Sequence, residues 1–141
     1  MDKFKEIRPV VLGIIIKNNK LLVERGYDEN NKTEFYRCIG GGIEFLEKSD
    51  EALKREFKEE LNIEIQVKDY LGLSENIFKY KGKDAHELIL FYNIEINDKD
   101  YKEKYIINDD GQQSVATWIA INKFRNKELI VYPEKVIDYI S

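Results

Sequence analysis

The stretch GGIEFLEKSDEALKREFKEELNI, from Gly41 to Ile63, joins a glycine run to a charged segment with helical periodicity. One apolar face of a helix is predicted by residues that recur every four positions, namely Leu53, Phe57 and Leu61. We expect Ser49 to cap the start of this helix, and Asn62, which tolerates the left-handed conformation, to end it. The segment therefore predicts a loop followed by a helix that packs on a core.

Three glutamates lie along one flank of this helix. Glu56 and Glu60 are four residues apart and Glu59 is one step around, so their carboxylates project from neighbouring positions. Like charges at this spacing destabilise a helix, and Arg55 supplies only one guanidinium to balance them. Carboxylate oxygens are ligands that Mg²⁺ and Mn²⁺ prefer. The pattern indicates a divalent metal site; for a helix considered alone, a solvated charged surface is the favoured alternative.

Three consecutive glycines precede the helix. Gly40, Gly41 and Gly42 allow backbone groups to approach a metal or an anion without obstruction by a Cβ atom. A strand-like stretch from Glu34 to Ile39 leads into them. We therefore expect a glycine loop at a strand-to-helix junction, where phosphates and metals often bind.

With these residues in place, the stretch resembles the Nudix box, the family signature G-x5-E-x7-R-E-U-x-E-E-x-G-U, in which U is a bulky aliphatic residue. The matching positions are Gly41, Glu47, Arg55, Glu56, Glu59, Glu60 and Ile63. Phe57 and Asn62 stand where an aliphatic residue and a glycine are usual. Ile39 and Leu46 stand where a proline and a glycine often occur. The matching residues are mostly charged and in register, which makes the motif specific.

The resemblance implies a MutT-like hydrolase that cleaves a nucleoside diphosphate linked to another moiety, with Mg²⁺ or Mn²⁺ as cofactor. The metal ligands that it implies are Glu56, Glu59, Glu60 and the backbone carbonyl of Gly40. It also implies that Glu47 and Arg55 form a structural pair that ties the loop to the helix. One carboxylate must take a proton from the attacking water, and within the box we favour Glu59 for this role.

The rest of the chain mixes strands and helices. Pro9–Lys17 and Lys20–Arg25 flank the turn Asn18-Asn19 and predict a hairpin. Further strands are predicted at Glu34–Ile39, Glu64–Leu73, Glu75–Tyr80, His86–Ile96 and Val115–Ala120. We expect a polar surface excursion from Asn97 to Gln113 and a closing helix that begins at Pro133. This order resembles the α/β Nudix fold, an α/β/α sandwich with a mixed sheet and a loop-helix-loop box.

Candidate substrate-binding residues lie outside the helix. Arg25 and Arg37 are placed to bind phosphates, with Arg8 as a weaker third, and a solvated arginine is the alternative for each. Tyr80 occupies a position that marks dinucleoside polyphosphate hydrolases of the family, and the proline that marks ADP-ribose hydrolases has no counterpart. We therefore expect a nucleoside triphosphate or a dinucleoside polyphosphate as substrate, with ADP-ribose or a nucleotide sugar as the alternative.

Further acidic residues are candidates for the site. Glu87 begins a strand that we expect to pass nearby, although an exposed glutamate at a strand edge is the favoured interpretation. Asp109 and Asp110 are the other candidates, because Thr117 stands where family members often carry an acidic residue before the late tryptophan. Cys38 is the one cysteine and is expected in the core.

Composition limits the alternatives. A chain of 141 residues predicts a single domain, 1–141, with its own core. A net charge of −4 without a basic face argues against a polymeric nucleic acid as ligand. No long apolar run or signal-like N-terminus occurs, so we expect a cytoplasmic protein without a membrane partner; a homodimer remains open. The rival function is a non-catalytic nucleotide-sensing domain, which the complete set of box carboxylates disfavours.

Overall fold

The computed structural model describes residues 5–109 and 111–140, without the side chain of Asp109. The elements in chain order are β1 (Ile7–Ile14), β2 (Ile16–Lys17), β3 (Lys20–Asp28), β4 (Thr33–Gly42), α1 (Ser49–Leu61), β5 (Ile65–Tyr80), β6 (Lys83–Ile96), the 3-10 helix η2 (Asp98–Asp100), β7 (Lys104–Asp109), β8 (Gln112–Ala120), α2 (Ile121–Arg125), β9 (Val131–Tyr132) and the 3-10 helix η3 (Glu134–Tyr139).

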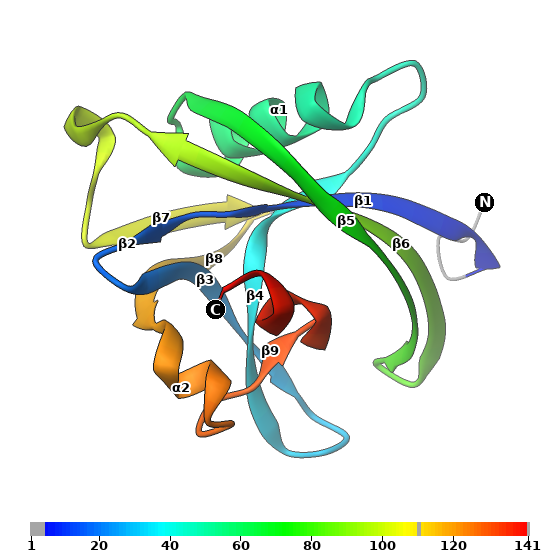
Figure 1. Ribbon diagram of the computed structural model, residues 1–141. Coiled ribbons are helices and arrows are strands. Elements are labelled where there is room, and N and C mark those ends of the chain that lie inside the picture. Colours follow the sequence, from blue (N-terminus) through cyan, green and yellow to red (C-terminus); the bar gives the residue numbers. More distant parts are fainter. Residues whose placement is uncertain (1–4, 110, 141) are drawn as a thin grey trace.

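The described strands form one mixed sheet in the order β5-β6-β1-β4-β3-β8-β7, with β2 paired to β3 and β9 paired to β4. Strands β1 and β6 are parallel, with Ile7 opposite His86, and most of the other pairs are antiparallel. Helix α1 covers one side of the sheet, and α2 and η3 lie on the other side (Figure 1). This arrangement confirms the predicted α/β/α sandwich.

The predicted hairpin at the start of the chain is present. Asn18 and Asn19 both have positive φ, 52° and 61°, as a two-residue turn between right-twisted strands requires. The strand before the turn is interrupted at Ile15, so β1 and β2 are separate elements. Ile15 itself is buried, and the break leaves the apolar run in the core.

Strand β4 changes partners halfway along its length. Its first part, Thr33–Cys38, pairs with β3, and its last part, Ile39–Gly42, pairs with β1. The glycines therefore belong to a strand, which corrects the predicted glycine loop: the loop begins only at Ile43. Backbone pairing with β1 explains the difference, because it holds the glycines extended.

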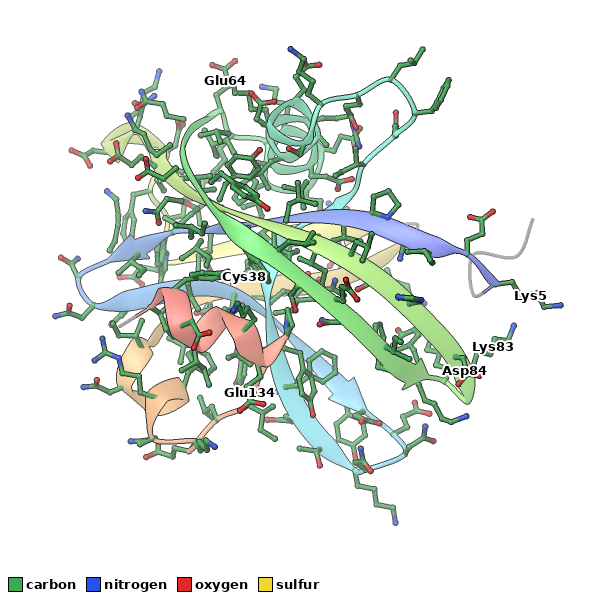
Figure 2. The ribbon with its side chains drawn as sticks, turned by 45° about the vertical axis from the view of Figure 1, so that its right-hand side comes forward. Lys5, Cys38, Glu64, Lys83, Asp84 and Glu134 are labelled. Atoms are coloured by element: carbon green, nitrogen blue, oxygen red, sulfur yellow. The ribbon has the colours of Figure 1, made fainter. Side chains whose placement is uncertain are left out.

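Two hydrophobic cores lie on the two sides of the sheet. Helix α1 packs the predicted stripe into the first core, where Leu53 and Phe57 are fully buried and Leu61 is 5% exposed. The second core lies under α2 and η3 and contains Cys38, as predicted. Figure 2 shows Cys38 deep inside the molecule, and burial raises the pKa of its thiol to about 12.

The second half of the chain departs from the sequence-based expectation at two places. The expected surface excursion Asn97–Gln113 contains strand β7, in which Tyr105 and Ile107 are buried. They alternate with the exposed residues Lys104, Ile106 and Asn108, and this alternation at period two marks a half-buried strand. The expected closing helix is the 3-10 helix η3 and begins after Pro133. None of the helices in the described ranges is long and apolar enough to cross a membrane.

Candidate active site

Helix α1 begins one residue earlier than expected. Lys48 is the N-cap residue and has extended backbone geometry, without a side-chain cap. The hydroxyl group of Ser49, the predicted cap, instead makes a 2.7 Å hydrogen bond with the hydroxyl of Tyr92. This contact ties the helix start to β6. The helix ends as predicted, because Asn62 adopts the left-handed conformation and donates its N–H to the carbonyl of Lys58.

The carboxylate of Glu56 lies directly against Gly41. A Cβ atom at Gly41 would lie 2.5 Å from the carboxyl carbon of Glu56, so a larger residue here would displace this carboxylate from its position. A Cβ atom at Gly40 would collide with the carbonyl oxygen of Val11. The two glycines thus allow the helix to place a carboxylate on the end of β4.

The predicted pair Glu47–Arg55 is present and bidentate. Arg55 donates from Nε to Oε2 of Glu47 at 2.7 Å and from Nη2 to Oε1 at 3.0 Å. Its Nη2 also donates to the carbonyl oxygen of Gly42 at 2.9 Å. The hydrogen bonds from Arg55, followed by the one from the N–H of Glu44, lower the pKa of Glu47 to about 2. Loop, strand end and helix are joined through one guanidinium.

Arg55 contacts further carboxylates as well. Its Nη1 lies 3.0 Å from Glu56, 3.3 Å from Glu59 and 3.7 Å from Glu44. We call Arg55 and its four partners, Glu44, Glu47, Glu56 and Glu59, the Arg55 cluster. Four carboxylates around one guanidinium leave an excess of negative charge, and two of them, first Glu47 and then Glu56, raise the pKa of Arg55. Glu60, one turn after Glu56, is partly buried on the same helix.

The oxygen donors of this region suit a hard divalent cation in their chemistry. Within the described residues, however, no group of three or more Asp, Glu, His or Cys side chains lies close enough together to hold a metal ion. The N–H of Ile43 donates to the carbonyl of Pro9. In an antiparallel pair this alternation directs the carbonyl groups of Gly40 and Gly42 away from β1. The Gly40 carbonyl thus faces the edge of β4 that does not pair with β1, beyond the last residue that pairs with β3.

Glu87 is buried, contrary to the favoured interpretation of an exposed strand-edge glutamate. It is 4% exposed and accepts hydrogen bonds from Arg8 Nη1 at 3.2 Å and from Arg37 Nη2 at 2.9 Å. We call these three residues the Glu87 cluster. Sequence analysis missed the association because the partners are 79 and 50 residues apart along the chain. No local periodicity connects them, and only the parallel pairing of β1 with β6 places Arg8 beside Glu87.

Two of the remaining candidate residues contact residues outside the Arg55 cluster and the Glu87 cluster. Arg25 pairs with Glu34 at 3.1 Å on the exposed surface of the β3–β4 hairpin. Tyr80 pairs across the β5–β6 hairpin with Lys83, which Figure 2 shows at the far tip of that hairpin, away from α1. Asp110 and the side chain of Asp109 lie outside the described residues.

The comparisons with known proteins agree with this geometry. A family model, NUDIX domain, matches residues 7–139. Among solved structures, a MutT NUDIX hydrolase from Burkholderia pseudomallei is 18% identical, with a TM-score of 0.62 and coverage of 84% of this chain and 86% of that chain. The E. coli ORF135 protein is 19% identical, with a TM-score of 0.60 and coverage of 96% and 86%.

A third structure, the DNA mismatch repair protein MutT (family Nudix hydrolase) from methicillin-resistant Staphylococcus aureus 252, is 21% identical, with a TM-score of 0.56 and coverage of 96% of both chains. The comparison with curated proteins yields no match. At these identities the solved structures establish the fold, and the family model, which spans nearly the whole chain, establishes the family. The chain therefore belongs to the Nudix family and is a hydrolase that acts on pyrophosphate bonds.

Proposed function

We propose that this hydrolase is a metal-dependent pyrophosphohydrolase that cleaves a phosphoanhydride bond of a nucleoside diphosphate linked to another moiety. Its proposed substrates are nucleoside triphosphates or dinucleoside polyphosphates. The observation that carries the proposal is the contact of Glu56 with Gly41, where the helix places a carboxylate against the end of β4. A phosphoanhydride is shielded by its own negative oxygens, so catalysis needs charge neutralisation at such a place.

The cofactor in this proposal is a divalent cation, Mg²⁺ or Mn²⁺, held by Glu56, Glu59, Glu60 and the carbonyl of Gly40. When bound, such an ion neutralises phosphate charge and lowers the pKa of a coordinated water. Arg55 hydrogen-bonds to both Glu56 and Glu59, so metal binding competes with these contacts. With a metal bound, the Glu47–Arg55 pair would keep the loop in place, and Glu56 and Glu59 would be available to hold the ion.

Within the helix, Glu59 is our proposed base for the attacking water. Its side chain is 58% exposed, which leaves it accessible to a water molecule next to a bound phosphate. A base must lie within hydrogen-bond reach of the proton that it accepts. Arg25, Arg37 and Tyr80 remain the proposed substrate-binding residues, and Arg37 lies on β4, the strand that ends in the glycines.

A product-release screen tests this function. Purified protein with Mg²⁺ or Mn²⁺ would be assayed against nucleoside triphosphates, dinucleoside polyphosphates, ADP-ribose and nucleotide sugars. We expect turnover in one of the first two classes, its loss in Glu59→Gln, and full retention in Glu103→Gln, an exposed glutamate outside the box. Nucleotide binding without turnover of any compound would establish the sensing function instead, and turnover of ADP-ribose alone would correct the substrate class.

A further inference from the structure

Glu87 is the one charged residue that is buried in the described part of the chain. A buried carboxylate is costly unless it is paired, and here it has two partners, Arg8 and Arg37, from two different strands. One guanidinium would already neutralise it. The Glu87 cluster therefore carries one positive charge in excess.

The guanidinium groups are accessible although the carboxylate is not. The side chains of Arg8 and Arg37 are 39% and 35% exposed, whereas that of Glu87 is 6% exposed. A guanidinium has five N–H donors, and within the described residues each arginine donates a side-chain hydrogen bond to Glu87 alone. Glu87 thus holds the guanidinium groups of Arg8 and Arg37 in place, and the remaining N–H groups of both can bind an anion.

The Glu87 cluster touches the same strand end as the Arg55 cluster, from the other side. A Cβ atom at Gly42 would lie 3.3 Å from Nη2 of Arg8, whereas one at the preceding residue, Gly41, would meet the carboxylate of Glu56. Neighbouring residues of a strand face opposite sides of the sheet. Only a strip of glycine backbone separates the guanidinium of Arg8 from the carboxylate of Glu56.

From this arrangement we infer that the Glu87 cluster is a receptor for a phosphate group, with Arg8 and Arg37 as the binding residues and Glu87 as the residue that positions them. The assignment of this phosphate to the nucleotide substrate rests on the proposed function. Arginine forks match phosphate oxygens bidentately. The adjacent glycines Gly41 and Gly42 lie against Glu56 and Arg8, so one polyphosphate chain at this strand end could contact both clusters. In this inference the carboxylates of the Arg55 cluster would bind the cation, and the guanidiniums of the Glu87 cluster would bind the anion.

A purely structural role for the cluster makes a different prediction. If the ion pairs served only to hold β1, β4 and β6 together, an apolar residue of similar volume would do so without the cost of burying a charge. Replacement of one arginine would then change stability and leave anion affinity unaltered. The receptor role predicts a loss of anion affinity beyond any change in stability.

The first experiment measures binding of inorganic pyrophosphate by calorimetry with EDTA present, which removes the metal and tests the arginines directly. We expect Arg8→Gln and Arg37→Gln each to weaken binding by about tenfold to a hundredfold, the loss expected for a hydrogen bond to a charged group. Arg37→Lys, which keeps the charge but not the fork, should lie between wild type and Arg37→Gln. Lys123→Gln, the same charge change on exposed α2, should bind like wild type. Thermal unfolding of each variant verifies that it is folded.

The second experiment separates this inference from the proposed function. For the best substrate, Arg8→Gln and Arg37→Lys should raise KM with a much smaller effect on kcat, because the lost contact is made in the ground state and the transition state alike. Loss of pyrophosphate binding in the arginine variants of a protein that hydrolyses no nucleotide would support the receptor and reject the proposed function. Equal pyrophosphate affinity in wild type and both Gln variants, or no binding by wild type at millimolar concentration, would overturn the receptor even in an active enzyme.

Discussion

The two sides of the β4 strand end carry the same kind of ion pair in opposite proportions. In the Arg55 cluster one guanidinium is surrounded by four carboxylates, and in the Glu87 cluster one carboxylate is surrounded by two guanidiniums. Glu87 is more buried than both of its partners, whereas Arg55 is more buried than Glu44 and Glu59 but less buried than Glu47 and Glu56. The comparison teaches that the minority charge of each cluster organises its geometry, whereas the majority charge is left over for a ligand of the opposite sign.

The largest effect that this comparison predicts is on catalysis. Glu56→Gln keeps the shape of the side chain but removes one negative charge from the Arg55 cluster. We expect kcat to fall about a hundredfold or more, where each tenfold corresponds to about 1.36 kcal/mol of activation free energy. Steady-state kinetics on the best substrate would measure it, with Glu103→Gln as control. A Glu56→Gln enzyme as fast as this control would show that the excess carboxylates are only a charged helix surface.

Metal binding should also stabilise the fold through this excess. A divalent cation that binds only the folded protein stabilises it by about 2.7 kcal/mol at a hundredfold its dissociation constant. We expect Mg²⁺ or Mn²⁺ to raise the thermal midpoint of wild type, and the shift to be absent in Glu60→Gln. Melting curves at increasing metal concentration that stay unmoved for wild type would argue against a cation site.

Removal of the single negative charge of the Glu87 cluster should destabilise the folded protein. Glu87→Gln leaves Arg8 and Arg37 next to a neutral amide, and because both are partly solvated we expect a loss of about 2 kcal/mol, below the usual cost of breaking a fully buried pair. Chemical denaturation would measure the change. Asp98→Asn, which breaks the exposed pair with Lys17, is the matched control and should unfold like wild type. Equal free energies of unfolding for Glu87→Gln and Asp98→Asn would show that Glu87 does not organise its cluster.

The Arg55 cluster should make the stability of the folded protein depend on pH. The pKa of Glu47 is lowered from 4.5 to about 2 in the folded protein, chiefly by its hydrogen bonds from Arg55. A depressed folded-state pKa contributes stability that is present above pH 4.5 and is lost as the pH falls toward 2. Unfolding midpoints measured across this range should fall more steeply for wild type than for Glu47→Gln. Parallel curves would show that the pair does not couple folding to protonation.

The smallest effect concerns the loop that carries Glu44 and Glu47. Leu46 is 90% exposed and has a φ of 69°, a conformation that costs a non-glycine residue strain. Leu46→Gly should relieve this strain, and after allowance for the greater freedom of the unfolded chain we expect a gain of about 0.5 kcal/mol. Differential scanning calorimetry would detect the rise. A lower midpoint would mean that Leu46, and not only Arg55, fixes the loop.

Local patterns predicted the parts of this molecule that depend on local interactions. The apolar stripe of α1, the turn at Asn18-Asn19 and the helix end at Asn62 follow from spacing and backbone preference, and all three are confirmed. The Glu47–Arg55 ion pair was also predictable, because the motif fixes both positions. A motif of this kind records contacts that lie close together along the chain.

Features that depend on distant partners were missed. Ser49 was expected as a cap, but the nearby hydroxyl of Tyr92, 43 residues later, takes its hydrogen bond. The glycines were expected in a loop, but β1 holds them in a strand. Glu87 was expected at the surface because the residues next to it in the sequence do not indicate that Arg8 or Arg37 lies close to it. Burial of a charge is decided by partners that the topology brings together, and residue spacing does not reveal that topology.

The parallel pairing of β1 with β6 also sets the order in which this chain can fold during synthesis. Residues of β1 pair with residues of β6 that lie 79 positions later, from Ile7 with His86 to Ile14 with Asn93. At about 5–20 residues per second a ribosome needs roughly 4–16 s to make the intervening segment. During that interval one edge of the apolar run Val10–Ile15 has no strand to pair with, although β4 can already cover the other edge. The nascent chain is therefore most exposed to aggregation before β6 emerges, and Arg8 can meet Glu87 only once that stage has passed.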